Sequence, residues 1–150
     1  TFPNNTDGFA SRAPSVIPGV QVRGIFGATN SVTGQIVWKH DIPEQVARSG
    51  MLVAGDLVFF GQNDSTFNAA NAATGAILWS FVGTSVENGG GANAAPIAYV
   101  TGGKEFIANA FGGNSLVRRR PRVSPLGDAM IAFALPDPGY TGPRIIHASR

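Results

Sequence analysis

The stretch Ala-Ala-Asn-Ala-Ala-Thr-Gly-Ala-Ile-Leu-Trp at residues 69–79 repeats a pattern that occurs at residues 28–38 as Ala-Thr-Asn-Ser-Val-Thr-Gly-Gln-Ile-Val-Trp. The common core is Ala-x-Asn-x-x-Thr-Gly-x-Ile-x-Trp, and it includes both tryptophans of the chain. Repeats with a period of about 40 to 50 residues are typical of β-propellers, in which each repeat forms a four-stranded blade. Because one blade cannot bury both of its faces, we expect each repeat to pack against its neighbours.

The Asn-x-x-Thr-Gly part of the repeat predicts a tight turn between two strands. The Asn side chain accepts bonds from nearby backbone amides, and the Gly supplies a positive φ. The apolar residues that follow predict strands ending at Trp38 and Trp79. We expect each Trp to lie on a blade face, between adjacent blades. The alternative is a β-hairpin repeated by chance, with two unrelated surface tryptophans.

The composition favours many short strands joined by tight turns. The 150 residues are 43% hydrophobic and 13% charged and include 20 Gly and 10 Pro, which argues against a helical bundle. No apolar run approaches the roughly 18 residues that would indicate a transmembrane helix. Cysteine is absent, which excludes disulfides, thiolate metal sites and thiol catalysis within these residues.

Positive charge is concentrated at residues 118–122, where four arginines occupy five positions although the net charge is only +2. Such a cluster indicates either a loop in contact with water or with a partner's carboxylates, or a nucleic-acid contact. No aromatic residues alternate with the arginines, and no recognition fold accompanies them. We therefore favour the loop and expect no nucleic-acid partner. The chain begins at Thr1 with no hydrophobic signal segment, so we expect a processed product or a fragment.

The sequence predicts an extended arm over residues 1–20, propeller blades over 21–136 and a surface tail over 137–150. Residues 44–48 are expected to form a short helical turn. The expected strands lie at 22–28, 35–38, 51–54, 57–61, 66–70, 78–81, 96–100, 105–110 and 129–136. This gives an all-β fold of about two blades plus a closing strand, which is an incomplete ring.

Five segments in order resemble the C-terminal part of the PQQ-dependent (quinoprotein) dehydrogenases, eight-bladed propellers that oxidise alcohols, polyols or sugars. They are residues 32–39, 54–61, 69–79, 95–99 together with 103–108, and 127–136. The chain departs from the family at Asn30 and Asn71, where Asp is usual. It departs again at residues 46–50, where many alcohol-oxidising members have Trp-Asn-Gly-Gly. These departures affect the substrate pocket more than the fold.

The resemblance implies a cofactor, pyrroloquinoline quinone (PQQ), on the propeller axis with a calcium ion. In that family a carboxylate takes the alcohol proton while hydride passes to the quinone. The calcium ligands and the base belong to earlier blades, so we expect them on a partner chain and expect no catalytic or metal-binding residue here. Gly112, Gly113 and Asn114 fall where the family approaches PQQ, and Arg48 takes the approximate place of the missing Trp-Asn pair. The alternatives are an ordinary connecting turn for the first three and a solvated loop position for Arg48.

The resulting hypothesis is the small chain of a periplasmic PQQ- and calcium-dependent alcohol or polyol dehydrogenase. A larger chain would supply the remaining blades of the eight-bladed ring, and electrons would pass to a cytochrome or a membrane quinone. The alternative is a non-catalytic propeller scaffold for protein assembly in the bacterial envelope, which would need neither PQQ nor calcium.

Overall fold

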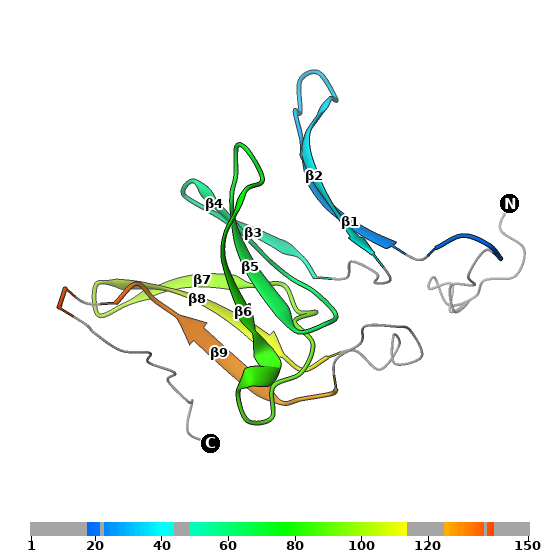
Figure 1. The fold of residues 1–150 in the computed structure, drawn as a ribbon. Helices are drawn as coiled ribbons and strands as arrows, with labels where there is room; N and C mark the ends of the chain where they lie inside the picture. The colour runs from blue at the N-terminus through cyan, green and yellow to red at the C-terminus, as the bar shows by residue number, and fades with distance from the viewer. Residues whose placement is uncertain (1–17, 22, 44–48, 114–124, 137, 140–150) are drawn as a thin grey trace, which may run out of the picture.

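The computed structural model describes residues 18–21, 23–43, 49–113, 125–136 and 138–139. Within these ranges, nine strands form three antiparallel sheets that follow one another along the chain (Figure 1). The expected all-β, partial-propeller fold is confirmed. The proposed helical turn at 44–48 lies outside the described residues, as do the arginine cluster at 118–122 and most of the arm and tail. The proposed division into arm, blades and tail therefore stays a prediction.

The strands agree closely with the expected ones. The first sheet contains β1 (Arg23–Thr29) and β2 (Ile36–Pro43). The second contains β3 (Met51–Ala54), β4 (Leu57–Gly61), β5 (Thr66–Asn71) and β6 (Ile77–Val82). The third contains β7 (Ile97–Thr101), β8 (Lys104–Phe111) and β9 (Ala129–Phe133). A short 3₁₀ helix, η1 (Gly83–Ser85), follows β6.

The second sheet is a complete four-stranded blade, with its strands hydrogen-bonded in the order of the sequence. The expected closing strand, β9, pairs with β8 and so becomes the third strand of the last sheet. The first strands of the second and third sheets, β3 and β7, contact each other, as neighbouring blades of a propeller do. In the part of the chain that the structure describes, no helix is long and apolar enough to span a bilayer.

The two repeats form turns of the same geometry. Asn30 Oδ1 accepts hydrogen bonds from the amides two and three residues later at 2.9 and 3.0 Å, and Asn71 Oδ1 does so at 3.0 Å in both cases. The glycines that close the turns have φ angles of +72° at Gly34 and +74° at Gly75. Because residues with a side chain are strained at these angles, the turn geometry requires glycine at both positions. The turn chemistry read from the sequence is therefore confirmed atom by atom.

Trp38 joins the first sheet to the turn of the second repeat. Its indole Nε1 donates to the carbonyl oxygen of Ala72 at 2.8 Å. The ring covers Gly75 so closely that an added Cβ would lie 2.6 Å from Trp38 Cδ2. Two residues further along β2, His40 Nε2 lies 2.5 Å from the carbonyl oxygen of Gly75, and His40 is half-buried. Two side chains of one blade thus hold the turn of the next.

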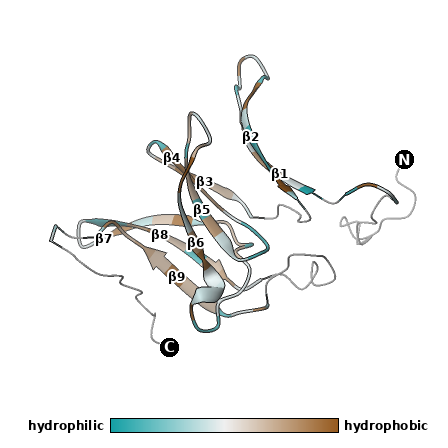
Figure 2. Ribbon diagram, viewed as in Figure 1, coloured by the Kyte–Doolittle hydropathy of each residue, from teal (hydrophilic) through white to brown (hydrophobic). Residues whose placement is uncertain are grey.

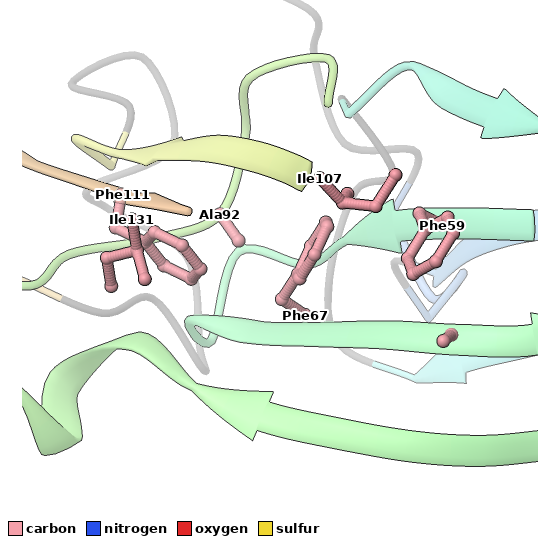
Figure 3. Packing of buried hydrophobic residues seen from close by; sticks show 7 residues of the cluster. Phe59, Phe67, Ala92, Ile107, Phe111 and Ile131 are labelled. Carbon is pink, nitrogen blue, oxygen red and sulfur yellow. The ribbon is translucent and has the colours of Figure 1, made fainter. Parts of the chain in front are cut away.

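Apolar cores fill both spaces between the sheets. Between the first and second sheets the buried residues are Phe26, Trp38, Ile42, Val58, Phe60 and Ala70. A second cluster, which joins the second and third sheets, contains Phe59, Phe67, Ala69, Ala92, Ile107, Phe111 and Ile131 (Figure 3). Adjacent residues of β4 alternate between the two cores, so this strand is buried on both faces. The fully apolar Leu-Val-Phe-Phe run of β4 follows from this position.

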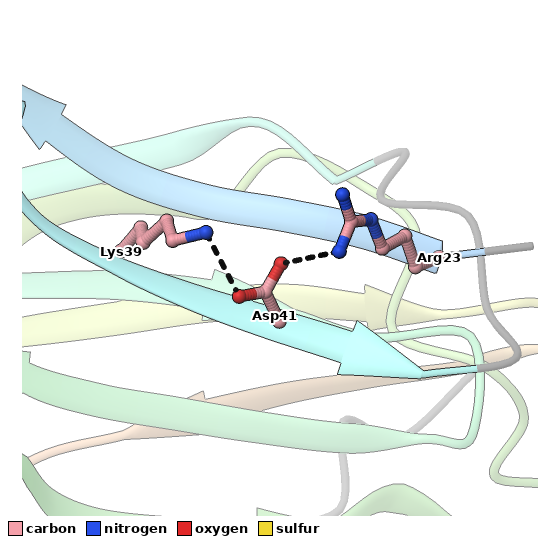
Figure 4. Close-up of polar contacts among 3 residues, drawn as sticks. All are labelled: Arg23, Lys39 and Asp41. Atoms are coloured by element: carbon pink, nitrogen blue, oxygen red, sulfur yellow. Dashed lines mark ion pairs between the residues drawn. The ribbon is translucent and has the colours of Figure 1, made fainter.

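The faces at the two ends of the sheet series are open. The strands of the third sheet carry many hydrophobic residues (Figure 2). Among them, the side chains of Tyr99 and Met130 are 40% and 55% exposed. On the first sheet, Lys39 and Arg23 both pair with Asp41, at 3.1 and 3.8 Å (Figure 4). All three side chains are more than 40% exposed, so these pairs contribute at most about 1 kcal/mol.

Candidate functional site at the loop end

The loops that connect the strands gather at one end of the second and third sheets. This loop end consists of residues 49–50, 61–66, 83–96, 111–113 and 125–128. The opposite end carries the short turns at 30–34, 55–56, 71–76 and 102–103. The sequence-predicted residues Gly112 and Gly113 belong to the loop end. Arg48 and Asn114 lie outside the described residues, so their roles stay predictions.

Main-chain hydrogen bonds fix the Gly112–Gly113 segment against two other loops. The amide of Gly113 donates to the carbonyl oxygen of Gly91 at 2.9 Å. The amide of Gly127 donates to the carbonyl oxygen of Gly112 at 3.1 Å. One residue earlier, the carbonyl oxygen of Phe111 accepts from Gly90 at 2.7 Å. The segment is therefore held on both sides by backbone, and it presents peptide groups rather than side chains.

The two glycines differ in the space around them. Gly113 has a φ of +70°, and a Cβ there would lie 3.0 Å from the carbonyl oxygen of Pro125. At Gly112 the nearest atom to an added Cβ is the Gly127 carbonyl oxygen at 3.6 Å, which is ordinary contact. The fold thus requires glycine at position 113 but leaves open space beside position 112. A glycine at such an open position permits a ligand to approach the backbone.

Asn93 is a candidate that the sequence analysis did not single out. Both of its amide atoms, Oδ1 and Nδ2, are sealed from solvent and make no hydrogen bond within the described residues. Its neighbours are fixed, because Ala92 N donates to the Gln62 carbonyl oxygen at 3.0 Å and Ser49 Oγ donates to the Ala94 carbonyl oxygen at 2.9 Å. Buried amides without partners are rare, because each lost bond costs roughly 1–3 kcal/mol. The sequence gives no signal for this position, since Asn in a glycine-rich loop is ordinary turn composition.

The loop end carries three carboxylates, those of Asp64, Glu87 and Asp128, but they do not form a metal-binding group. Among the residues described, no three His, Asp or Glu side chains lie close enough together to hold a metal ion. A cavity of about 170 Å³ lies between β2 and the second sheet, lined by residues that include His40, Asp41, Phe60 and Asn68. This cavity includes none of the sequence-predicted residues. Besides backbone groups, the loop end offers amide side chains, among them Asn93 with both of its polar atoms unpartnered, and these groups are suited to positioning a ligand.

The fold and its repeats define a class, that of β-propellers built from Trp-terminated repeats. Residues 7–123 match the PQQ_2 family model, described as outer membrane protein assembly factor BamB. The chain belongs to this family.

The relatives confirm the expected resemblance to quinoprotein dehydrogenases. A quinoprotein ethanol dehydrogenase of Pseudomonas putida is 33% identical over 59% of this chain, and methanol dehydrogenase subunit 1 of Methylorubrum extorquens is 34% identical over 59%. Among solved structures, the quinohemoprotein alcohol dehydrogenase ADHIIG of Pseudomonas putida HK5 matches with a TM-score of 0.50 and 30% identity over 60% of this chain. The chain spans only 14%, 13% and 12% of these three proteins.

Proposed function

We propose that these residues form part of a PQQ-dependent dehydrogenase that oxidises an alcohol or polyol, and that they build one wall of the cofactor pocket. The observation that carries the proposal is the Gly112–Gly113 backbone, held rigidly at the loop end with open space beside Gly112. The similarity to quinoprotein alcohol dehydrogenases supports the choice of cofactor.

The residues present fit a planar, polar cofactor. The half-buried peptide group at Gly112 permits close approach of a flat ring, since no Cβ projects from it. Asn93 carries a donor and an acceptor that no described residue satisfies, and because both atoms are sealed from solvent, a ligand reaches them only when the surrounding loop opens. When bound, PQQ supplies the quinone carbon that accepts hydride from the alcohol. The role of this chain is then to hold the cofactor's edge and to exclude water, which strengthens every polar contact inside the pocket.

The remaining parts of the site are proposed to lie outside these 150 residues. Calcium needs several hard oxygen ligands, and a base is needed for the alcohol proton. We place the ligands and the base on the further blades, carried by a larger partner chain. We further propose a periplasmic location and electron transfer to a cytochrome or a quinone. The name of the similar methanol dehydrogenase subunit includes cytochrome c, which supports a cytochrome as the acceptor.

The first test is a titration of the complete protein, including all blades, with PQQ in the presence of calcium, followed by absorbance. We expect saturable binding, and we expect Gly112→Ala to weaken it at least tenfold while the stability of the cofactor-free protein changes by less than about 0.5 kcal/mol. The control is Gly102→Ala, at a turn on the opposite end with a φ of +58°. It should lower stability and leave the affinity for PQQ unchanged.

Two outcomes would contradict the proposal. If the complete protein does not bind PQQ, the proposed cofactor is wrong. Equal affinities for the Gly112→Ala variant and the unchanged protein would show that Gly112 belongs to an ordinary connecting turn.

A scaffold for protein assembly is the second candidate function. It is favoured by the description of the family model and by the open sheet faces, where Ile25 and Val37 are 50% and 56% exposed. Exposed apolar faces of this kind are typical of protein contacts. A complete protein that binds neither PQQ nor calcium, but retains a protein partner through purification, would support this function instead.

A further inference from the structure

The loop between η1 and β7 contains Asn88 and Gly89, the one Asn-Gly pair in the sequence. Asparagine is a thermolabile residue, and it is most reactive before glycine, because no side chain hinders the glycine nitrogen from reaching the asparagine amide carbon. Asn88 is exposed, lies in a turn and has a φ of +57°. Water therefore has access to its side-chain amide.

Hydrogen bonds do not hold this side chain as they hold the asparagines of the two repeat turns. Oδ1 of Asn30 and Oδ1 of Asn71 each accept bonds from two main-chain amides, which fixes the orientation of those side chains. Within the described residues, the side chain of Asn88 makes no hydrogen bond. Its main-chain carbonyl oxygen accepts from the amide of Asp128 at 2.9 Å. The side chain of Asn88 can therefore turn toward the nitrogen of Gly89.

Packing fixes the glycine of the pair. An added Cβ at Gly89 would collide with the carbonyl oxygen of Gly83, so the fold excludes any larger residue at this position. The nitrogen of Gly89 donates to the carbonyl oxygen of Val86 at 3.2 Å, which is the long end of the range for N–H···O hydrogen bonds. An attack by this nitrogen on the Asn88 amide has to break that weak bond.

We propose that Asn88 is a site of spontaneous deamidation, a covalent modification that needs no enzyme. The nitrogen of Gly89 loses its proton and bonds to Asn88 Cγ, the Cγ–Nδ2 bond breaks, and ammonia leaves. The product is a cyclic succinimide, which water then opens. Addition of water at Cγ gives aspartate. Addition at the main-chain carbonyl carbon gives isoaspartate, in which the main chain runs through Cβ and Cγ.

Isoaspartate lengthens the main chain where the loop has no room for an added atom. The carbonyl oxygen of Asn88 is bonded to Asp128, and the amide of Gly90 donates to the carbonyl oxygen of Phe111 at 2.7 Å. An added Cβ at Gly90 would lie 2.6 Å from the nitrogen of Gly127, so these backbones are already in close contact. The longer chain cannot keep the geometry of both hydrogen bonds. We therefore expect the modified loop to separate from residues 125–128.

The test is peptide mass spectrometry of the complete protein, with all its blades, after incubation at mildly alkaline pH. One sample stays folded and the other is unfolded in urea. In both samples we expect the peptide with Asn88 to replace its amide NH₂ by OH and to contain isoaspartate, while the peptide with Asn30 stays unchanged in the folded sample. Loss of the amide in urea alone would show that the fold protects Asn88, and the inference would be wrong. An intact Asn88 in both samples would also overturn it.

The consequence for the loop is measured with Asn88→Gly, which removes the amide and suits the positive φ. We expect the urea midpoint of the incubated natural protein to fall below that of a fresh sample. The midpoint of Asn88→Gly should not change on incubation. An unchanged midpoint after full conversion of Asn88 would overturn the expected separation of the loop. Neither measurement involves PQQ, so their outcome does not depend on the proposed function.

Discussion

Two asparagines of this chain differ in whether their side-chain amides have hydrogen-bond partners. Asn71 Oδ1 accepts bonds from the backbone amides of Ala73 and Thr74 and from the Thr74 hydroxyl, so its acceptor is satisfied. Asn93 makes no such bond with either amide atom among the described residues. The first asparagine stabilises a turn, whereas the second costs free energy unless a ligand or a water satisfies it. This contrast is what distinguishes a structural amide from a candidate binding residue.

At this scale we predict opposite effects for two Asn-to-Leu substitutions, which keep the number and branching of the side-chain heavy atoms. Asn93→Leu should raise the free energy of unfolding of the cofactor-free protein by about 1 kcal/mol, because it removes an unsatisfied amide. It should also weaken PQQ binding. Asn71→Leu should lower the free energy of unfolding by about 1–2 kcal/mol, because the turn loses its side-chain acceptor. Urea denaturation measures both, and destabilisation by Asn93→Leu would mean that this amide has a partner in the free protein.

At the scale of elements, strand β4 organises the packing. Val58 and Phe60 face the first sheet and Phe59 faces the third, so loss of β4 would open both cores. Its last residue, Gly61, also brings the loop end together. An added Cβ at Gly61 would collide with the carbonyl oxygen of Ala92, next to Asn93. Close approach of two backbones thus positions the loop that carries the unsatisfied amide.

We therefore predict that Gly61→Ala destabilises the protein by about 2–3 kcal/mol, since neither backbone can move away without breaking the bond from Ala92 N to Gln62 O. Thermal or urea unfolding of the complete protein measures this. Gly112→Ala is the matched control, because its added methyl group meets only ordinary contacts. A Gly61→Ala variant as stable as the control would show that the 83–96 loop shifts freely and does not hold Asn93 in place.

At the scale of the whole molecule, the three sheets are an incomplete structure with apolar faces at both ends. The first sheet exposes Ile25 and Val37, and the third exposes Tyr99, Met130 and Ile97. Surfaces of this kind are covered by a neighbouring blade or a partner in stable proteins.

We accordingly predict that these 150 residues, expressed alone, bind the hydrophobic dye ANS and form heterogeneous oligomers in size-exclusion chromatography with light scattering. Addition of the remaining blades should abolish dye binding and give one defined species. A stable monomer that unfolds cooperatively without binding dye would show that the open faces need no partner, and it would favour a self-sufficient fold.

Much of the fold follows from the sequence, because its signals are local. The Asn-x-x-Thr-Gly turns at 30–34 and 71–75 depend on hydrogen bonds within four residues and on one positive φ angle, and the strands between them follow from short apolar runs. The sequence also placed Gly112 and Gly113, since the glycine pair follows a recognisable strand. The role of the pair as a cofactor wall remains a proposal.

Only the tertiary structure decided which distant residues meet. The sequence located Trp38 on a blade face, but the geometry of two sheets was needed to bring its indole onto Ala72 and Gly75. Trp79 occupies the same position in the second repeat, but its ring packs against Phe133 of the third sheet. Asn93 became a candidate for the same reason, because solvent exclusion and missing hydrogen bonds depend on three loops that are far apart in the chain. Local turn chemistry determined the repeats of this protein, and long-range packing determined what each repeat contacts.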